Sequence, residues 1–185
     1  MIETMTGGIE QDAMRKMEKV ALRTSVIQAL KMLIVLGNTL MYFPKDKKSQ
    51  VYGLRDYVIR RDAGGTVIQI VTRDQKVCST LDERFKAACE SAGYEGDKPV
   101  DLFTGITRQA NGKYFVKQEL ADVAVVQNEA EVGNYSEKDL PWVALTWNLM
   151  RGDDYGVGLV EEYAGDYSVY SSLSEAILNL ASLAS

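Results

Sequence analysis

The pattern of apolar residues predicts one long helix near the start of the chain, over about residues 9–37. Apolar side chains recur there at helical spacing, and charged residues occupy the opposite face of the first half. Residues 30–36 are apolar almost all round, so we expect this part to be buried on several sides. Gly37 and Asn38 follow, and both residue types tolerate the left-handed conformation that ends many helices.

The middle of the chain, about residues 39–148, predicts antiparallel hairpins and one short helix. Turns are expected at Asp62-Ala63-Gly64-Gly65 and at Asn111-Gly112. The short helix is expected to start after Thr80, with Glu83 completing a capping box, and to end at Gly93. Loops are expected at residues 44–49 and 129–139. The expected strands cover residues 39–43, 51–54, 56–61, 66–73, 100–107, 113–120, 123–127 and 141–148.

A second long helix is predicted over about residues 159–185, after a loop at residues 152–158 that contains three glycines. Its apolar stripe consists of Tyr163, Tyr167, Tyr170, Leu173, Ile177, Leu180 and Ala184. The helix has neither a glycine nor a basic residue in its last turns. We interpret the chain as a section of a longer protein; the alternative is a terminal helix docked on its own core.

These elements together predict an α+β fold in a single domain. It has a long helix at each end and hairpins that form a small sheet or barrel with one short helix between them.

The amino-acid composition argues against several kinds of catalytic, metal-binding and nucleic-acid-binding site. The 185 residues include no histidine, which excludes Ser-His-Asp and Cys-His catalysis and metal sites with imidazole ligands. A net charge of −5 argues against binding of a phosphate backbone as the main role. No apolar run approaches the roughly 20 residues of a membrane helix, and the N-terminus has no secretory-signal pattern.

Cys78 and Cys89 are the only cysteines. Two cysteines are too few for a fold held by several disulfides or for a metal site built from cysteines. We expect both to be reduced, buried or half-buried thiols of an intracellular protein.

The loop at residues 152–158 is the most conspicuous local motif. Glycines before a helix can bring backbone amides close to an anion, but the spacing fits neither common phosphate-binding fingerprint. Asp153 and Asp154 would repel a phosphate, and a magnesium site would need further oxygen ligands. Glu161 and Glu162 suit the positive end of the helix dipole, while neighbours in a helix point about 100° apart, which does not suit a glycosidase pair. A turn that caps and directs the last helix is the structural interpretation.

Several blocks, taken in order, resemble one family. Residues 28–44, with Gly37-Asn38 between helix and strand, are similar to a passage of portal proteins, the head-to-tail connectors of short-tailed bacteriophages. The other similar blocks are residues 54–65, 71–75, 152–156 and 160–166. The family commonly has arginine where this chain has Val157, and residues 78–141 match only in their pattern of a short helix and strands.

The resemblance implies a structural protein without catalytic, cofactor-binding or metal-binding residues. Portal proteins form a ring, typically of twelve subunits, at one capsid vertex of the virion. A separate terminase motor pumps DNA through this ring, and capsid, scaffold and tail proteins contact it. No membrane is involved. The matched region corresponds to the outward-projecting wing, and the last helix would lead toward the stem.

The resemblance also selects candidate residues for subunit contacts and for positioning the last helix; packing within one subunit is the alternative for each. The candidates are Asp154, Tyr155, Gly156 and Gly158 in the loop, and Glu161, Glu162, Tyr163 and Asp166 on the helix.

Two other hypotheses stay open at this stage. One is a carboxylate- or magnesium-dependent enzyme that uses Asp153, Asp154, Glu161 and Glu162; the other is a small adaptor protein that acts on its own. On the portal hypothesis, we expect the isolated chain to be a monomer or a small oligomer.

Overall fold

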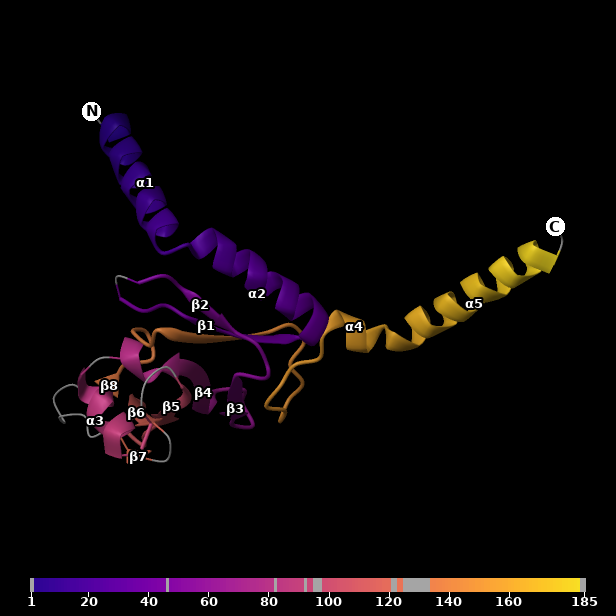
Figure 1. Ribbon diagram of the computed structural model, residues 1–185. Helices are drawn as coiled ribbons and strands as arrows, with labels where there is room; N and C mark the ends of the chain where they lie inside the picture. The colour runs from indigo at the N-terminus through magenta and orange to yellow at the C-terminus, as the bar shows by residue number, and fades with distance from the viewer. Residues whose placement is uncertain are drawn as a thin grey trace.

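The computed structural model is an α+β body with a helical arm at each end (Figure 1). It describes residues 2–45, 47–81, 83–91, 93–94, 98–120, 123–124 and 134–183. Two antiparallel sheets make up the body, and in the described residues they do not close into a barrel, so the barrel alternative is wrong.

The predicted N-terminal helix is divided in two, α1 (Ile2–Lys19) and α2 (Leu22–Leu36). The division falls at Ala21, whose backbone is left-handed, with φ of 53°. Its cause lies elsewhere in the chain, because the Val20 carbonyl accepts hydrogen bonds from both the backbone N–H and the hydroxyl of Ser49, each 2.9 Å long. The predicted end is confirmed: Gly37 has φ of 72°, and its N–H donates to the Leu33 carbonyl.

Burial of α2 is one-sided. Ser25, Ala29 and Leu33 are buried against the body. Leu30 and Val35 each keep 49% of their surface exposed, so the expected burial on several sides is wrong. Spacing identified the apolar residues of this helix, but it did not reveal how many neighbours cover them.

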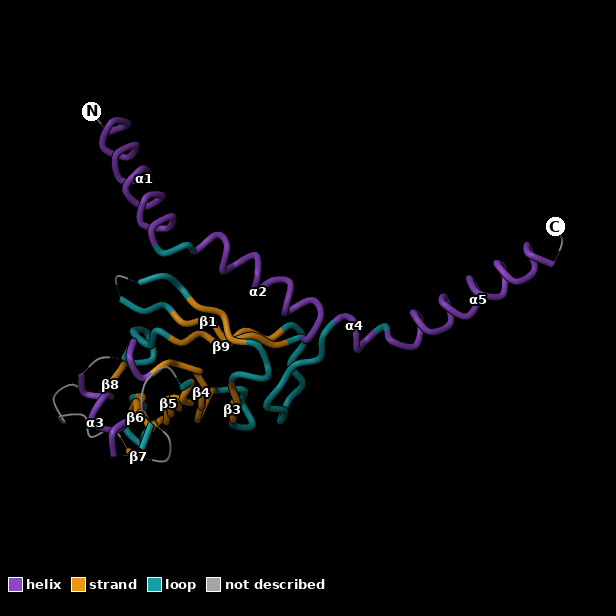
Figure 2. Tube along the Cα trace, in the orientation of Figure 1, coloured by secondary structure: helices purple, strands orange, loops and turns teal. Residues whose placement is uncertain are grey.

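The smaller sheet has the strand order β2-β1-β9 and lies beneath α2 (Figure 2). Its central strand is β1 (Asn38–Tyr42), which pairs with β2 (Gln50–Tyr52) and β9 (Trp142–Thr146). Leu40 and Thr39 on β1 are fully buried. Segments about 100 residues apart in sequence therefore lie side by side, which brings the two ends of the body together.

The larger sheet has the order β3-β4-β5-β6-β7, and β8 also pairs with β6. Both predicted turns are confirmed, since they join β3 to β4 and β5 to β6. The loop expected at residues 129–139 is wrong in part, because β8 lies within it; residues 129–133 are outside the described residues. The strand expected at 123–127 is described only at 123–124. The strands are β3 (Tyr57–Arg61), β4 (Val67–Val77), β5 (Pro99–Arg108), β6 (Tyr114–Leu120), β7 (Val123–Ala124) and β8 (Asn134–Tyr135).

The short helix α3 (Glu83–Ser91) follows a 3-10 turn, η1 (Cys78–Thr80). Thr80 does not cap α3 as predicted; its hydroxyl donates to the Val77 carbonyl at 2.8 Å within the preceding turn. Cys78 and Cys89 are buried as expected, but they form a disulfide with 6.3 Å between their Cα atoms, so the expectation of two free thiols is wrong. The 3-10 turn places Cys78 against the inner face of α3, where Cys89 lies.

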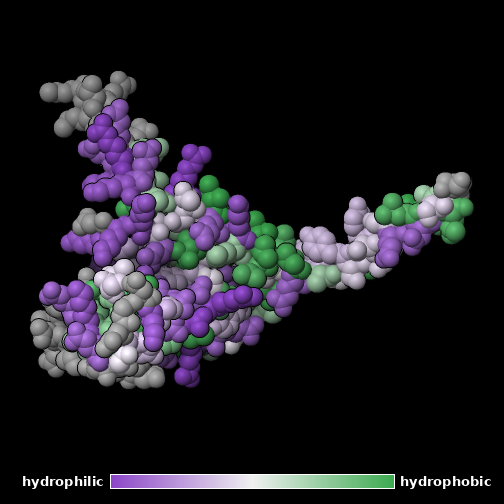
Figure 3. Space-filling model, viewed as in Figure 1, coloured by the Kyte–Doolittle hydropathy of each residue, from purple (hydrophilic) through white to green (hydrophobic). Residues whose placement is uncertain are grey.

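The predicted C-terminal helix is also divided, into α4 (Leu159–Glu162) and α5 (Ala164–Leu183). No described residue of α5 is buried, and the helix extends away from the body as an arm (Figure 1). Figure 3 shows hydrophobic surface where α2 meets α4 and again toward the end of α5. Ala184, the last member of the predicted stripe, lies outside the described residues.

Candidate functional site: the helix junction

Three glycines bring two distant backbones into direct contact where α2 ends and α4 begins. A Cβ on Gly37 would overlap the backbone N of Gly158. A Cβ on Gly158 would lie 2.5 Å from the Val35 carbonyl oxygen, and one on Gly156 would lie 2.9 Å from the Asn148 carbonyl oxygen. All of these neighbours are backbone atoms, which cannot rotate away, so the crossing requires glycine at each position.

The Asn38 side chain holds this crossing together. Its Nδ2 donates to the Gly156 carbonyl at 2.6 Å and to the Leu36 carbonyl at 2.9 Å. Its Oδ1 accepts the Gly156 N–H at 2.7 Å. Asn38 is 3% exposed, so a short amide satisfies backbone groups that water cannot reach.

The end of β9 forms the other side of the junction. The Trp147 N–H donates to the Gly37 carbonyl, and the Val157 N–H donates to the Asn148 carbonyl, each at 2.8 Å. An isolated bridge between Asn148 and Val157 therefore ties the loop to the chain just after β9, before the loop enters α4, which packs on α2.

Two side chains of the same loop reach the larger sheet. The Asp154 carboxylate accepts the Arg61 N–H at 2.5 Å, and the Tyr155 hydroxyl accepts the Ile59 N–H at 3.1 Å. Because β3 is an edge strand, its outward N–H groups would otherwise be open to another strand. Arg61 strengthens this contact, since its Nε donates to the Asp154 carbonyl at 3.2 Å. One loop thus connects α2, both sheets and α4.

Tyr57 and Asp62, near the junction, have shifted pKa values. Burial, together with the nearby Tyr155, raises the pKa of Tyr57, so this phenol stays protonated across the physiological range. In the turn after β3, the hydrogen bond from the Thr66 N–H lowers the pKa of Asp62, and the Gly64 N–H adds to the effect.

The structure brings together only half of the candidate residues. Asp154, Tyr155, Gly156 and Gly158 lie in the junction. The other four are exposed: Glu161 and Glu162 on α4, Tyr163 at its end, and Asp166 in the first turn of α5. Asn38 is the residue of the junction that the sequence analysis did not select as a candidate. It was interpreted only as part of a helix stop, although Gly37-Asn38 also carried the family resemblance.

The carboxylates of the enzyme hypothesis do not converge. Asp153, Glu161 and Glu162 are exposed, and Asp154 is engaged by Arg61. Among the described residues, no group of three or more Asp, Glu, Cys or His side chains is arranged to hold a metal ion. In the same part of the chain, no helix combines the length and apolar character needed to cross a membrane.

Comparison with known proteins gives a consistent result. The chain is 32% identical over 185 residues to the portal protein of Escherichia phage T7, an alignment that covers 96% of this chain and 34% of the relative. It is 34% identical over 179 residues to the portal protein of Enterobacteria phage T3, covering 93% and 33%. The portal protein of Pseudomonas phage phiKMV is 33% identical over 172 residues, covering 91% and 34%.

The chain thus spans about a third of the length of these curated relatives. The model of the bacteriophage head-to-tail connecting protein family matches residues 2–185. The match includes the ordered sequence blocks, the helix junction and both arms. This chain therefore belongs to the bacteriophage head-to-tail connecting protein family.

Proposed function

We propose that this chain is part of the subunit of a portal ring, the head-to-tail connector through which phage DNA is packaged and ejected. The observation that carries the proposal is the family match over residues 2–185, together with 32–34% identity to portal proteins of three phages. The protein acts mechanically, as a conduit and an attachment point, and we expect no catalytic activity and no cofactor.

The ring has twelve subunits on this proposal and occupies one capsid vertex of the virion after assembly in the host cytoplasm. Its partners are copies of itself and the capsid, scaffold, tail and terminase proteins. DNA passes through without sequence-specific binding. The net charge of −5 is compatible with this role, because each phosphate that a conduit neutralised would add affinity and resist passage.

Within that subunit we assign this chain to the wing, with α5 leading toward the stem. The support is the exposure of the α5 stripe: Leu173 is 59% exposed and Leu180 is 67% exposed. Apolar surface of this kind marks contact with another protein surface. In the ring, other parts of the subunit or its neighbours would cover it.

The candidate residues divide into two proposed roles. Asp154, Tyr155, Gly156 and Gly158 position α4 relative to α2, because their contacts tie the loop to α2 and both sheets. Glu161, Glu162, Tyr163 and Asp166 contact neighbouring subunits, a role that their exposure permits.

Electron microscopy of the protein expressed from its complete reading frame tests the proposal. We expect closed rings with a central channel. A protein that stays monomeric at every salt and protein concentration would contradict the assignment. Purified particles also give the number of subunits directly, which tests the expectation of twelve.

A further inference from the structure

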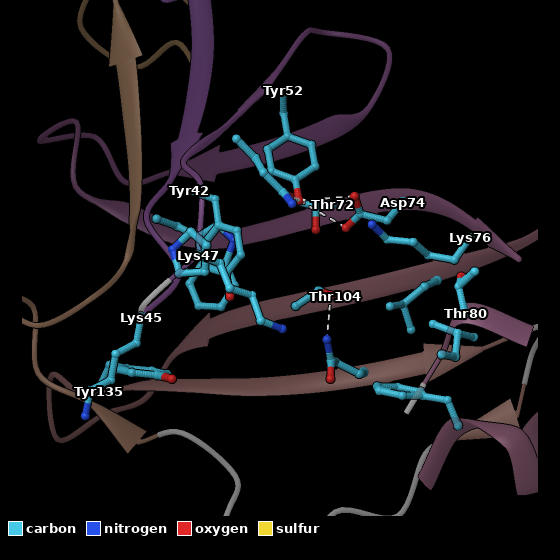
Figure 4. Close-up of a pocket in the computed structure, with 17 residues that line it drawn as sticks. Tyr42, Lys45, Lys47, Tyr52, Thr72, Asp74, Lys76, Thr80, Thr104 and Tyr135 are labelled. Carbon is cyan, nitrogen blue, oxygen red and sulfur yellow. Dashed lines mark hydrogen bonds between the residues drawn. The ribbon is translucent and has the colours of Figure 1, made fainter. Parts of the chain in front are cut away.

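A pocket of about 530 Å³ lies between the two sheets (Figure 4), and none of its described lining residues belongs to the helix junction. One wall is the stacked pair of Tyr42 and Trp142, whose ring centroids are 4.5 Å apart. The larger sheet forms the floor, and Leu81 and Phe85 close the side near α3. This volume is in the range of pockets that hold small organic ligands.

A polar row crosses the floor of this pocket where apolar residues would be expected. Thr72, Thr104 and Gln118 are direct neighbours across β4, β5 and β6. Thr72 is 1% exposed and Thr104 is 3% exposed. The row separates two apolar clusters of the same sheet, one around Ile106 and the other around Leu102.

Burying a hydroxyl group costs free energy unless the group is hydrogen-bonded. Apolar side chains in this row would instead have joined the two apolar clusters. The Gln118 amide donates to the Thr104 hydroxyl at 3.2 Å, which leaves the Thr104 proton able to bind an acceptor. A buried polar residue in the floor of a cavity, at a position where an apolar residue would pack better, is typical of a binding site.

Three lysines line the pocket. Lys45 and Lys47 come from the loop between β1 and β2, and Lys76 comes from β4 (Figure 4). Asp74 is the one acidic side chain among the described lining residues, and both of its oxygens accept from the Tyr52 hydroxyl, at 3.0 and 3.2 Å. The described lining residues thus carry three ammonium groups and one carboxylate, whereas the whole chain has a net charge of −5.

We propose that this pocket binds an acidic peptide segment of a partner protein. Carboxylates of the segment pair with Lys45, Lys47 and Lys76, which line the pocket, while its backbone amides bind the hydroxyl groups of Thr72 and Thr104. Tyr42 and Trp142 cover the apolar part of the segment. The inference stands whether or not the chain forms a ring.

A peptide fits this pocket better than a nucleic acid does. Three lysines around one pocket neutralise few phosphates, and nucleic-acid grooves instead follow the backbone over many nucleotides. The hydroxyl and amide groups of the row both donate and accept, as a peptide backbone requires.

Backbone NMR of the 185-residue chain, titrated with the blocked tripeptide acetyl-Glu-Thr-Glu-amide, tests the proposal. We expect shift changes at Thr72, Thr104 and Trp142. The triple substitution Lys45→Gln, Lys47→Gln and Lys76→Gln should weaken binding by about tenfold or more, because three charge-assisted contacts are lost. Thr104→Val, which keeps the shape but removes the hydroxyl, should weaken it by about three- to tenfold.

The matched control is Lys16→Gln, Lys31→Gln and Lys113→Gln, which removes the same charge from exposed lysines outside the pocket and should leave binding within about twofold. Four results would overturn the proposal: no binding of the tripeptide; equal binding of acetyl-Gln-Thr-Gln-amide; shift changes away from the pocket; or pocket binding of inorganic phosphate or oligothymidylate in place of the peptide. An unchanged spectrum of each variant outside the pocket shows that it remains folded.

Discussion

At the scale of the residue, the junction depends on glycines, which have no side chain, and on the short side chain of Asn38. Gly158 has φ of −83°, an ordinary value, so its requirement for glycine comes from space and not from backbone strain. The Val35 carbonyl occupies the position that a Cβ would need. Sequence reasoning identified the glycines of this loop, but it could not show that their neighbour is the end of a helix about 120 residues earlier.

Gly158→Ala should destabilise the fold by about 1–3 kcal/mol, because the added methyl group forces two backbones apart. Chemical denaturation followed by circular dichroism measures the loss. Gly165→Ala is the matched control, since nothing lies within 4 Å of its Cβ position at the start of α5. Equal effects of the two substitutions would refute the space argument.

Asn38→Ala should cost about 2–4 kcal/mol, since the buried Gly156 N–H and carbonyl both lose their partner. The same denaturation experiment applies. Asn179→Ala on the exposed surface of α5 serves as control and should change the stability by less than about 0.5 kcal/mol. If Asn38→Ala is as mild as its control, the amide does not hold the junction.

Asp62 provides a prediction about pH. Its folded-state pKa is lowered, so its charged form adds stability above the unfolded pKa of about 3.9, and this contribution is lost as the pH falls through the lower folded value. Asp62→Asn should therefore be less stable than the parent at pH 7, and the difference should vanish by about pH 2. Unfolding midpoints across this range measure it; a difference that is independent of pH would contradict the prediction.

At the scale of the element, features with a cause nearby in the sequence could be predicted. Features with a cause far away in the sequence could not. The turns at residues 62–65 and 109–112 and the helix stop at Gly37 were predictable because their causes lie within a few residues. The break at Ala21 was not predictable, because it depends on hydrogen bonds to the Val20 carbonyl from Ser49, 29 residues further along the chain. Periodicity likewise located the apolar face of α5 without showing that the face would be left uncovered.

The pairing of Cys78 with Cys89 ties η1 to α3 across 11 residues. Closing a loop of this size restricts the unfolded chain, and reducing the disulfide should lower the stability by about 3 kcal/mol. Unfolding midpoints with and without reductant measure this effect, and alkylation followed by mass spectrometry counts the free thiols. A chain purified in air that shows two alkylated thiols, and no response to reductant, would contradict the pairing.

At the scale of the whole molecule, α1 and α5 both point away from a body that holds the buried core (Figures 1 and 2). The chain also spans only about a third of the length of its portal relatives. Most of the surface that closes a ring would then come from polypeptide that this chain does not contain. The resemblance of the ordered sequence blocks pointed to the family, while the arrangement of the arms needed three-dimensional coordinates.

We therefore expect the isolated 185-residue chain to be a monomer or a small oligomer, with self-association that grows with concentration because the α5 stripe is exposed. Light scattering across a concentration series measures the mass. Leu173→Ser with Ile177→Ser should reduce any association, whereas Ser171→Ala on the same helix should not. A stable closed ring of the isolated chain would contradict this expectation.

The crossing of Gly37 and Gly158 also sets the angle between α2 and α4. Because backbone meets backbone there, no side-chain rotamer can absorb a change in that angle. In a closed ring every subunit repeats the same rotation, so a small error adds up from one copy to the next and opens a gap or forces an overlap. The junction would then fix this angle within each subunit before any two subunits meet.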